Sequence, residues 1–246
     1  MNKEIFKKEN ISHRNNNENW FLTVANIEKA KNFYEQEKIN PLAKDKMFFG
    51  GIYTILSIGE KSEKQKNLLK ILQEEGLNTP GKIITYREKL NGILDKKGNR
   101  PRFSKKIPNF IFEFAEWWQN STLPEEIIRD SKKERGIEFR DRLAGRYSPD
   151  KTPGMGPKVA SYFMEICGYE DVVTIDSRLW QFLKENKYCP EKIPDKEHSG
   201  TWLQRYKEFE EIISNIAREH NLTPVIFRLA LWHKYGQKTK KDINSL

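Results

Sequence analysis

Apolar residues recur every three or four positions along most of the chain, which is the spacing of one face of an α-helix. The segment from Pro108 to Gln119 is rich in Phe and Trp, and its pattern predicts a buried central helix. A proline follows Thr79, Leu123 and Thr223, and each pair predicts a helix start because proline fits the first helical turn. No stretch alternates strictly for long enough to form a sheet. The pattern therefore predicts an all-α protein of about ten helices.

Two local features refine the predicted helix boundaries. The apolar pattern that begins at Thr79 continues to Leu94, which predicts one helix over this stretch. Ser62 and Gln65 have the spacing of a capping box and predict a helix that begins just after Ser62. The first 19 residues are rich in Lys, Asn and Glu, so we expect them to be frayed.

The most informative stretch runs from Lys151 to Gly168. It contains a glycine-rich hairpin, Gly154-Met155-Gly156, and then a helix that Pro157 opens and Gly168 ends. Free backbone N–H groups at the start of this helix, together with its dipole, would bind a phosphate without reading base sequence. An ordinary tight turn between two helices is the alternative. The residues expected to bind DNA phosphate are Gly154, Met155, Gly156 and Pro157.

The helix after the hairpin carries the first candidate catalytic residue. Its polar face holds Lys158, Ser161, Tyr162 and Glu165, opposite an apolar face. A lysine in the first turn opposes the helix dipole, so Lys158 departs from the local rule. The dipole and partial burial would favour its neutral amine, which is a nucleophile. The alternative is a solvated lysine that touches DNA phosphate.

The second candidate catalytic residue is Asp176, which lies 18 residues after Lys158 and directly before an amphipathic helix. The short apolar segment Val172–Ile175 leads the chain back toward the start of the hairpin helix, so the carboxylate can come close to Lys158. Aspartate is also a preferred N-cap, and capping alone is the alternative. Both interpretations can hold, since a capping aspartate is held rigidly.

Composition and charge bear on the partner and the compartment. The chain of 246 residues is 37% hydrophobic and 32% charged, which is typical of a soluble globular protein. Its net charge of +9 favours a polyanionic partner. No apolar run approaches the ~20 residues that span a bilayer. The N-terminus lacks the apolar segment of a secretory signal peptide. We therefore expect an intracellular monomer that has a polyanionic partner and does not associate with a membrane.

Cysteine and histidine usage indicates neither a metal nor another cofactor. Cys167 and Cys189 are too few for a four-cysteine iron–sulfur or zinc site. The four histidines show no metal-ligand spacing. Cys167 falls on the apolar side of the helix after the hairpin, so we expect a buried free thiol.

The stretch GMGPKVASYFM…VVTIDSRLW resembles the signature of the helix-hairpin-helix DNA glycosylase superfamily. That signature is a G-x-G hairpin, a Lys two residues later in the lyase-competent members, and an Asp about 18 residues further on. The resemblance is closest to the archaeal-type 8-oxoguanine DNA glycosylases. Arg102-Phe103 before the segment SKKIPNFIFEFA and the C-terminal segment LALWHKYG support it. It extends over residues 46–236.

The resemblance implies a base-excision repair enzyme that is both a DNA N-glycosylase and an AP lyase, with 8-oxoguanine as the expected lesion. Lys158 would form a Schiff base with the sugar, and Asp176 would assist as its carboxylate partner. Phe103 and Trp232 would sandwich the flipped base, with core packing as the alternative. Arg178 would contact a DNA phosphate, with a surface ion pair as the alternative.

The resemblance also implies two helical lobes, with a groove between them that binds double-stranded DNA containing a damaged base. One lobe would comprise residues 46–168, including the hairpin, and the other would join residues 1–45 to 169–246. Two other functions stay open. A glycosylase for another lesion or mismatch is the second alternative, because pocket shape selects the base. A non-catalytic helix-hairpin-helix DNA-binding module needs the glycines but neither Lys158 nor Asp176.

Overall fold

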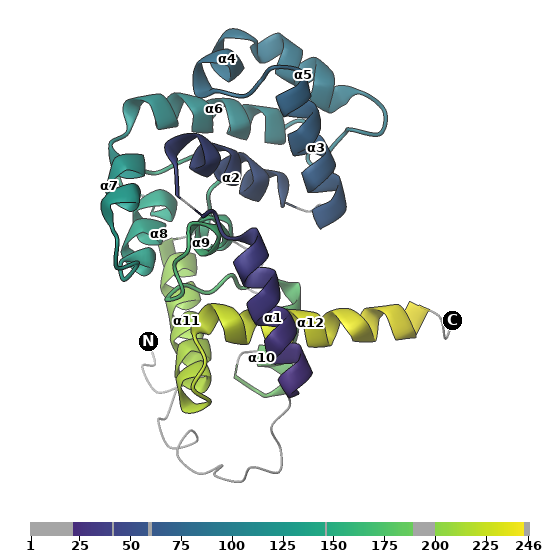
Figure 1. Cartoon of the computed structure of the whole chain (residues 1–246), viewed down its shortest axis with the longest axis vertical. Helices are drawn as coiled ribbons and strands as arrows, with labels where there is room; N and C mark the ends of the chain where they lie inside the picture. The colour runs from purple at the N-terminus through teal and green to yellow at the C-terminus, as the bar shows by residue number, and fades with distance from the viewer. Residues whose placement is uncertain (1–21, 41, 59–60, 146, 189–199, 244–246) are drawn as a thin grey trace.

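A computed structural model describes residues 22–40, 42–58, 61–145, 147–188 and 200–243 of the chain. For residues 200–204 and 236–243 the description covers the backbone alone. This part of the chain forms twelve helices and no strand (Figure 1), so the all-α prediction is confirmed, with more helices than expected. The helices are α1 (Val24–Glu37), α2 (Lys44–Leu56), α3 (Ser62–Glu74), α4 (Pro80–Thr85), α5 (Arg87–Asp95), α6 (Ile107–Asn120), α7 (Leu123–Arg129), α8 (Gly136–Ala144), α9 (Pro157–Ile166), α10 (Ser177–Glu185), α11 (Gly200–Glu219) and α12 (Pro224–Ile243).

The stretch expected to form one helix from Thr79 to Leu94 forms two. Thr79 caps α4, since its Oγ1 accepts a hydrogen bond from Lys82 N at 3.3 Å. The helix then breaks at Tyr86, whose backbone lies at φ −107° and ψ 42°. Both α4 and α5 pack on α6 and bury apolar side chains there, so the spacing of apolar residues is the same on both sides of the break. For that reason the pattern alone does not reveal it.

The expected capping box at Ser62 is also wrong. Helix α3 begins at Ser62 itself, with Lys61 as an N-cap that makes no side-chain hydrogen bond to the helix. The Ser62 hydroxyl lies 3.2 Å from the hydroxyl of Tyr53 on α2, and Gln65 is buried. Contact with a neighbouring helix has therefore replaced the local cap.

The upper half of the molecule in Figure 1 is built around α6, as the sequence predicts. Phe114 is fully buried and stacks on Phe48 of α2, with ring centroids 5.6 Å apart and planes 5° apart. Trp118 packs against both rings. Stacked and tilted aromatic pairs of this kind add to the free energy of area burial. The expected central position of this helix is therefore confirmed, but only one of its faces is buried, since Phe110, Phe112 and Trp117 are half-buried.

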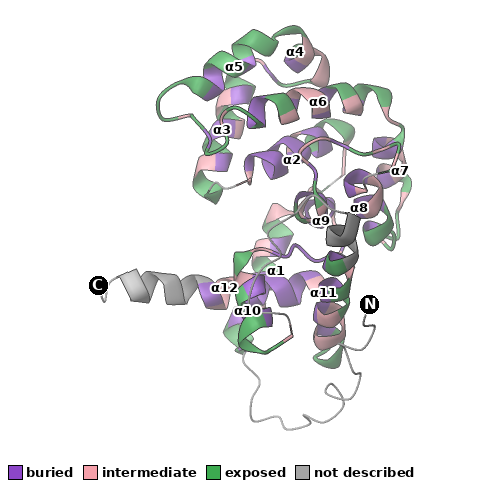
Figure 2. Cartoon of the chain, turned by 180° about the vertical axis from the view of Figure 1, so that it is seen from behind, coloured by how far each residue is buried: buried purple, intermediate pink, exposed green. Residues whose placement is uncertain are grey.

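The lower half is built around α12, which packs against α1, α10 and α11. Figure 2 shows that buried residues gather on α2 and on the first half of α12. The paired helices α8 and α9 lie between the two halves, and Ile39 N after α1 donates to Ile166 O of α9 at 2.7 Å. The proposed lobe boundaries at residues 45/46 and 168/169 stay a prediction, and residues 1–21 lie outside the description. None of the described helices is both long and apolar enough to cross a membrane.

Candidate active site

The connection between α8 and α9 is a tight hairpin that is anchored in the core. Thr152 N donates to Leu143 O at 3.1 Å, and Met155 N donates to Thr152 O at 3.1 Å. The side chain of Met155 is 1% exposed, so it holds the tip of the hairpin against the core. Met155 can therefore offer only its backbone to a partner.

The two glycines of the hairpin have different surroundings. Gly154 has φ +79°, and a Cβ added to it would lie 2.7 Å from Cγ of Phe110 on α6. Gly156 has an ordinary φ of −68°, is exposed, and a Cβ there would meet no atom within 4 Å. Within the described chain, the backbone N–H groups of Lys158 and Val159 have no acceptor. The open space at Gly156 and these free donors are compatible with a bound anion, and phosphate binding at the hairpin stays a prediction.

Lys158 is exposed in the first turn of α9, so the partial burial expected from the sequence is wrong. Asp176 is the N-cap of α10 and is half-buried. Its Oδ1 accepts hydrogen bonds from Arg178 N at 2.9 Å and Leu179 N at 3.0 Å. No described donor bonds its Oδ2, and the structure shows no contact between Asp176 and Lys158. One carboxylate oxygen therefore caps the helix while the other is available to a ligand.

The Arg178 side chain contacts Trp232 of α12. Its Nη1 donates to Trp232 O at 3.1 Å, and its guanidinium carbon lies 4.3 Å from the centroid of the Trp232 ring. Burial lowers the pKa of Arg178, with Asp176 opposing this effect, and the guanidinium remains charged. The alternative of a surface ion pair is wrong, because no carboxylate in the described part of the chain lies within ion-pair distance of the Arg178 guanidinium. Contact with a phosphate stays a prediction.

The two aromatic residues expected to sandwich a base lie in different halves of the molecule. Phe103, in the turn before α6, is 43% exposed, and the guanidinium of Arg102 lies 5.8 Å from its ring. Trp232 is half-buried and stacks on Phe33 of α1, with centroids 5.7 Å apart. No contact among the described residues joins Phe103 to Trp232. The core-packing alternative therefore applies in part to Trp232, which packs on Phe33, and hardly at all to Phe103, which is exposed.

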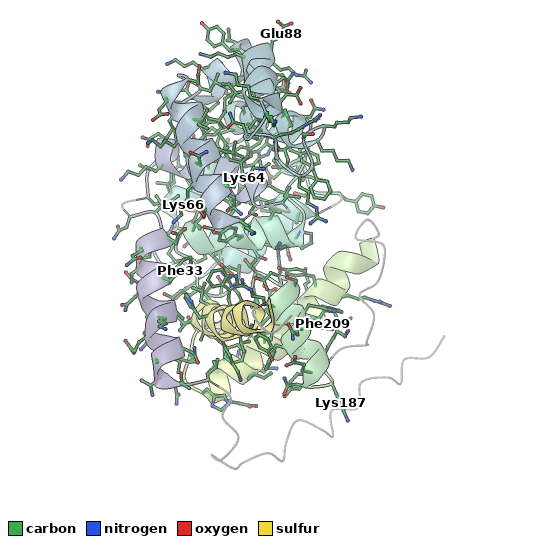
Figure 3. All side chains as sticks on the ribbon, turned by 90° about the vertical axis from the view of Figure 1, so that its right-hand side faces the viewer. Phe33, Lys64, Lys66, Glu88, Lys187 and Phe209 are labelled. Carbon is green, nitrogen blue, oxygen red and sulfur yellow. The ribbon has the colours of Figure 1, made fainter. Side chains whose placement is uncertain are left out.

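Positive charge surrounds Trp232. His233 packs edge-on against its ring, with centroids 5.1 Å apart. Burial, followed by the charges of Lys29, Arg178 and Arg228, lowers the pKa of His233, so this imidazole is neutral at physiological pH. Figure 3 looks along α12 and shows Phe33 beneath two lysines of α3, Lys64 and Lys66. Lys66 is paired with Glu37 and Lys64 donates to Arg100 O, so Arg178 is the cation that lies over the Trp232 ring.

Sequence reasoning missed a group of buried polar side chains behind Lys158 and Asp176. Ser161 and Glu165, expected on the polar face of α9, are 0% and 2% exposed. They face two buried arginines, Arg140 and Arg228. The signal in the sequence was an arginine inside an apolar run, as in VIFRLALW around Arg228.

Neither a metal-binding group nor a reactive thiol forms part of the candidate site in the described residues. No group of three or more His, Cys, Asp or Glu side chains in the described residues is arranged to hold a metal ion. Cys167 is a buried free thiol, as expected, and burial raises its pKa well above the usual range. Cys189 lies outside the described residues.

Comparison with protein families and curated proteins gives one consistent match. The family described as 8-oxoguanine DNA glycosylase matches residues 27–222. An 8-oxoguanine DNA glycosylase/AP lyase of Methanocaldococcus jannaschii is 32% identical over 161 residues, or 65% of this chain and 69% of that protein. The protein of the same name from Picrophilus torridus is 29% identical over 84 residues, which is 34% of this chain and 37% of that protein.

Solved structures agree with this match at the level of the fold. The crystal structure of M. jannaschii 8-oxoguanine glycosylase/lyase in complex with a 15mer DNA containing 8-oxoguanine superposes with a TM-score of 0.64 at 24% identity, covering 85% of this chain and 94% of that one. The 8-oxoguanine DNA glycosylase of Thermotoga maritima also has a TM-score of 0.64, at 23% identity, with coverage of 84% and 90%. With a family match over residues 27–222 and a helical fold shared with these structures, the chain belongs to the 8-oxoguanine DNA glycosylase family.

Proposed function

We propose that this chain excises 8-oxoguanine from duplex DNA and then cleaves the strand, with Lys158 as the nucleophile and Asp176 as its carboxylate partner. The observation that carries the proposal is the exposed Lys158 in the first turn of α9, directly after an open glycine hairpin that can hold a phosphate. The family match supports the lesion and the reaction class, since the related proteins are named 8-oxoguanine DNA glycosylase/AP lyase.

The reaction requires the base to leave the helical stack, because the sugar C1′ is unreachable inside the duplex. The neutral amine of Lys158 attacks C1′, the glycosidic bond breaks, and the departing base takes the bonding electron pair and a proton. Opening of the sugar ring gives a Schiff base between Lys158 and C1′, and β-elimination then releases the 3′ phosphate. Oδ2 of Asp176 would stabilise the positive charge that develops on the sugar or accept the amine proton.

DNA would be held mainly through its backbone. The free N–H groups at the start of α9, together with the space beside Gly156, would seat one phosphate near Lys158. The net charge of +9 and the cationic surroundings of Trp232 would attract the rest of the duplex. A single chain carries all of these groups, so we propose that it acts as a monomer.

Borohydride trapping tests the covalent step directly. The wild-type protein and an 8-oxoguanine duplex, incubated with borohydride, should give a stable protein–DNA adduct, and Lys158→Ala should give none, because the reduced Schiff base needs the ε-amine. Lys151→Ala is the matched control, since this exposed lysine lies in the same hairpin but outside α9. It should trap as the wild type does.

The opposite outcomes would be equally informative. An adduct of undiminished yield with Lys158→Ala would remove Lys158 from the role of nucleophile. A Lys158-dependent adduct with an abasic duplex, but no excision of 8-oxoguanine by the wild type, would leave the lyase chemistry standing and overturn the choice of lesion.

A further inference from the structure

The segment Val172–Ile175, which leads into Asp176, is held by buried side chains. It belongs to no helix or strand, so its backbone N–H groups must find other partners. Three consecutive N–H groups donate to side chains of α9 and α11. The bonds run from Val173 N to Glu210 Oε1 (2.9 Å), from Thr174 N to Glu165 Oε1 (2.9 Å) and from Ile175 N to Tyr206 Oη (3.0 Å).

Each of the two carboxylates is held in turn by a buried arginine. Arg140 of α8 donates to Glu210 twice, from Nη1 to Oε1 at 3.2 Å and from Nη2 to Oε2 at 2.6 Å. Nη2 of Arg228 on α12 donates to Oε2 of Glu165 on α9. The exposure of these four side chains is 0% for Arg140, 3% for Glu210, 5% for Arg228 and 2% for Glu165. The pairs therefore tie α8 to α11 and α9 to α12.

A gain in folding stability does not by itself explain why the protein has two buried ion pairs. Removing two charges from water costs about as much as their attraction returns, and an apolar pair of similar volume is often as stable or more so. Apolar side chains cannot, however, accept hydrogen bonds from the N–H groups of Val173 and Thr174. A buried N–H without a partner costs about 1–3 kcal/mol. The distinctive contribution of Glu165 and Glu210 is thus the pair of acceptor oxygens that fixes this backbone.

The network also reaches both candidate catalytic residues. Glu165 lies seven residues after Lys158 on the same helix, and Thr174 lies two residues before Asp176. Burial acts to lower the pKa of Arg228, but the carboxylates of Glu165 and then Asp176 raise it, and the net direction is upward. Arg228 therefore stays charged close to Asp176. One rigid helix thus carries both the nucleophile and an acceptor that holds the backbone before the carboxylate.

We propose that Glu165 and Glu210, held by Arg228 and Arg140, are positioning residues that fix the backbone before Asp176 and thereby set its carboxylate relative to Lys158. We call these four residues the carboxylate clamp. The inference rests on the proposed function, because it assumes that Lys158 and Asp176 act together. A misplacement of about 1 Å in a reacting group can cost on the order of a hundredfold in rate, so a loosened segment would slow the chemistry without weakening DNA binding.

Two double variants isolate the acceptor from the charges. E165M/R228M replaces the ion pair by apolar side chains and leaves Thr174 N without an acceptor. E165Q/R228M also carries no buried charge, but its amide oxygen can still accept from Thr174 N. We expect E165Q/R228M to excise 8-oxoguanine within about fivefold of the wild type in single-turnover assays, and E165M/R228M to be about ten- to a hundredfold slower. DNA affinity should differ little between the two variants, and E165M/R228M should melt at a lower temperature than E165Q/R228M because its buried Thr174 N–H has no acceptor.

Control variants address folding and a purely structural role. Glu126→Gln alters an arginine-paired glutamate of α7 that bonds Arg142 and has no contact with the segment Val172–Ile175, so its excision rate should stay within about twofold of the wild type. If E165M/R228M does not fold, E210M/R140M and E210Q/R140M repeat the comparison at Val173 N. Amide hydrogen exchange at Thr174 should be faster in E165M/R228M than in E165Q/R228M.

The inference and the proposed function fail in different ways. Equal excision rates for E165M/R228M and E165Q/R228M, beside an active wild type, would overturn the positioning role and leave the enzyme assignment intact. A wild type that forms no Lys158-dependent adduct with either an 8-oxoguanine or an abasic duplex would overturn the proposed function and the catalytic role of the carboxylate clamp together.

Discussion

Asp176 divides two roles between its two carboxylate oxygens. Oδ1 accepts from two backbone N–H groups at the start of α10, while no described donor bonds Oδ2. Capping and catalysis therefore do not exclude each other at this residue. Two substitutions separate them, because asparagine keeps an acceptor oxygen and alanine does not.

We expect Asp176→Asn to keep a melting temperature close to that of the wild type while excision falls at least about a hundredfold, since the amide has lost the charge. Asp176→Ala should lose about 1 kcal/mol of stability in addition, because the N-cap is gone. Thermal unfolding and single-turnover excision are the measurements. Excision by Asp176→Asn within a few-fold of the wild type would reduce Asp176 to a cap.

The Arg178 side chain can have either of two roles: holding the Trp232 ring in place or binding a DNA phosphate. Its guanidinium lies over the Trp232 ring and bonds the Trp232 carbonyl, so it can hold that ring in place. A phosphate contact would use the remaining N–H donors of the guanidinium. The salt dependence of DNA binding distinguishes the two roles.

For Arg178→Ala the predicted phosphate contact implies a slope of log affinity against log salt that is shallower by about one unit than in the wild type, because one phosphate contact is lost. The slope for the wild type should be steep, since phosphate contacts release counterions. An unchanged slope together with slower 8-oxoguanine excision would instead assign Arg178 to holding the Trp232 ring in place.

At the scale of elements, the two glycines of the hairpin between α8 and α9 are constrained differently. Gly154 must be glycine for the fold, because its φ is positive and Phe110 occupies the place of a Cβ. Gly156 meets no such constraint within the protein, since a Cβ there would have free space. A bound phosphate would fill that space, and the two positions should therefore respond oppositely to alanine.

Gly154→Ala should lower the free energy of unfolding by about 1–3 kcal/mol through backbone strain and the clash with Phe110. Gly156→Ala should change it by less than about 1 kcal/mol while weakening binding to damaged and undamaged duplexes alike. Denaturant unfolding and DNA titrations measure both effects. Wild-type DNA affinity in Gly156→Ala would remove the phosphate seat from this position.

At the scale of the whole molecule, the proposed base pocket draws on both halves of the fold. Phe103 precedes α6 in the upper half, and Trp232 lies on α12 in the lower half. Their rings make no contact with each other, so a base held by both would have to lie between them. The lobe arrangement would then decide whether the pocket forms.

Phe103→Ala and Trp232→Ala should each reduce 8-oxoguanine excision roughly ten- to a hundredfold, because stacking is worth about 1–3 kcal/mol per base. Trapping on an abasic duplex should survive in both, since there is no base to stack. Tyr86→Ala is the control, an exposed aromatic at the α4–α5 junction, and should affect neither substrate. Equal losses on the 8-oxoguanine and abasic duplexes would mark Phe103 and Trp232 as structural residues.

Interactions within a few residues of each other account for what the sequence alone determined. The helical period predicted the all-α fold and the central α6, the G-x-G-Pro pattern predicted the hairpin, and the residue preceding α10 predicted the cap at Asp176. The family resemblance, carried by the spacing of Lys158 and Asp176, was confirmed by the match over residues 27–222. The helices, the hairpin and the cap depend on short-range backbone geometry, which the local sequence specifies.

Tertiary contacts decided the rest. The exposure of Lys158, the break at Tyr86 and the contact of Ser62 with Tyr53 all depend on which helices become neighbours. The carboxylate clamp is the clearest case, since Arg140 and Glu210 are 70 residues apart and Glu165 and Arg228 are 63 apart. A charged residue in an apolar run marks a buried position, but its partner is chosen only when distant helices pack together and water is excluded from between them.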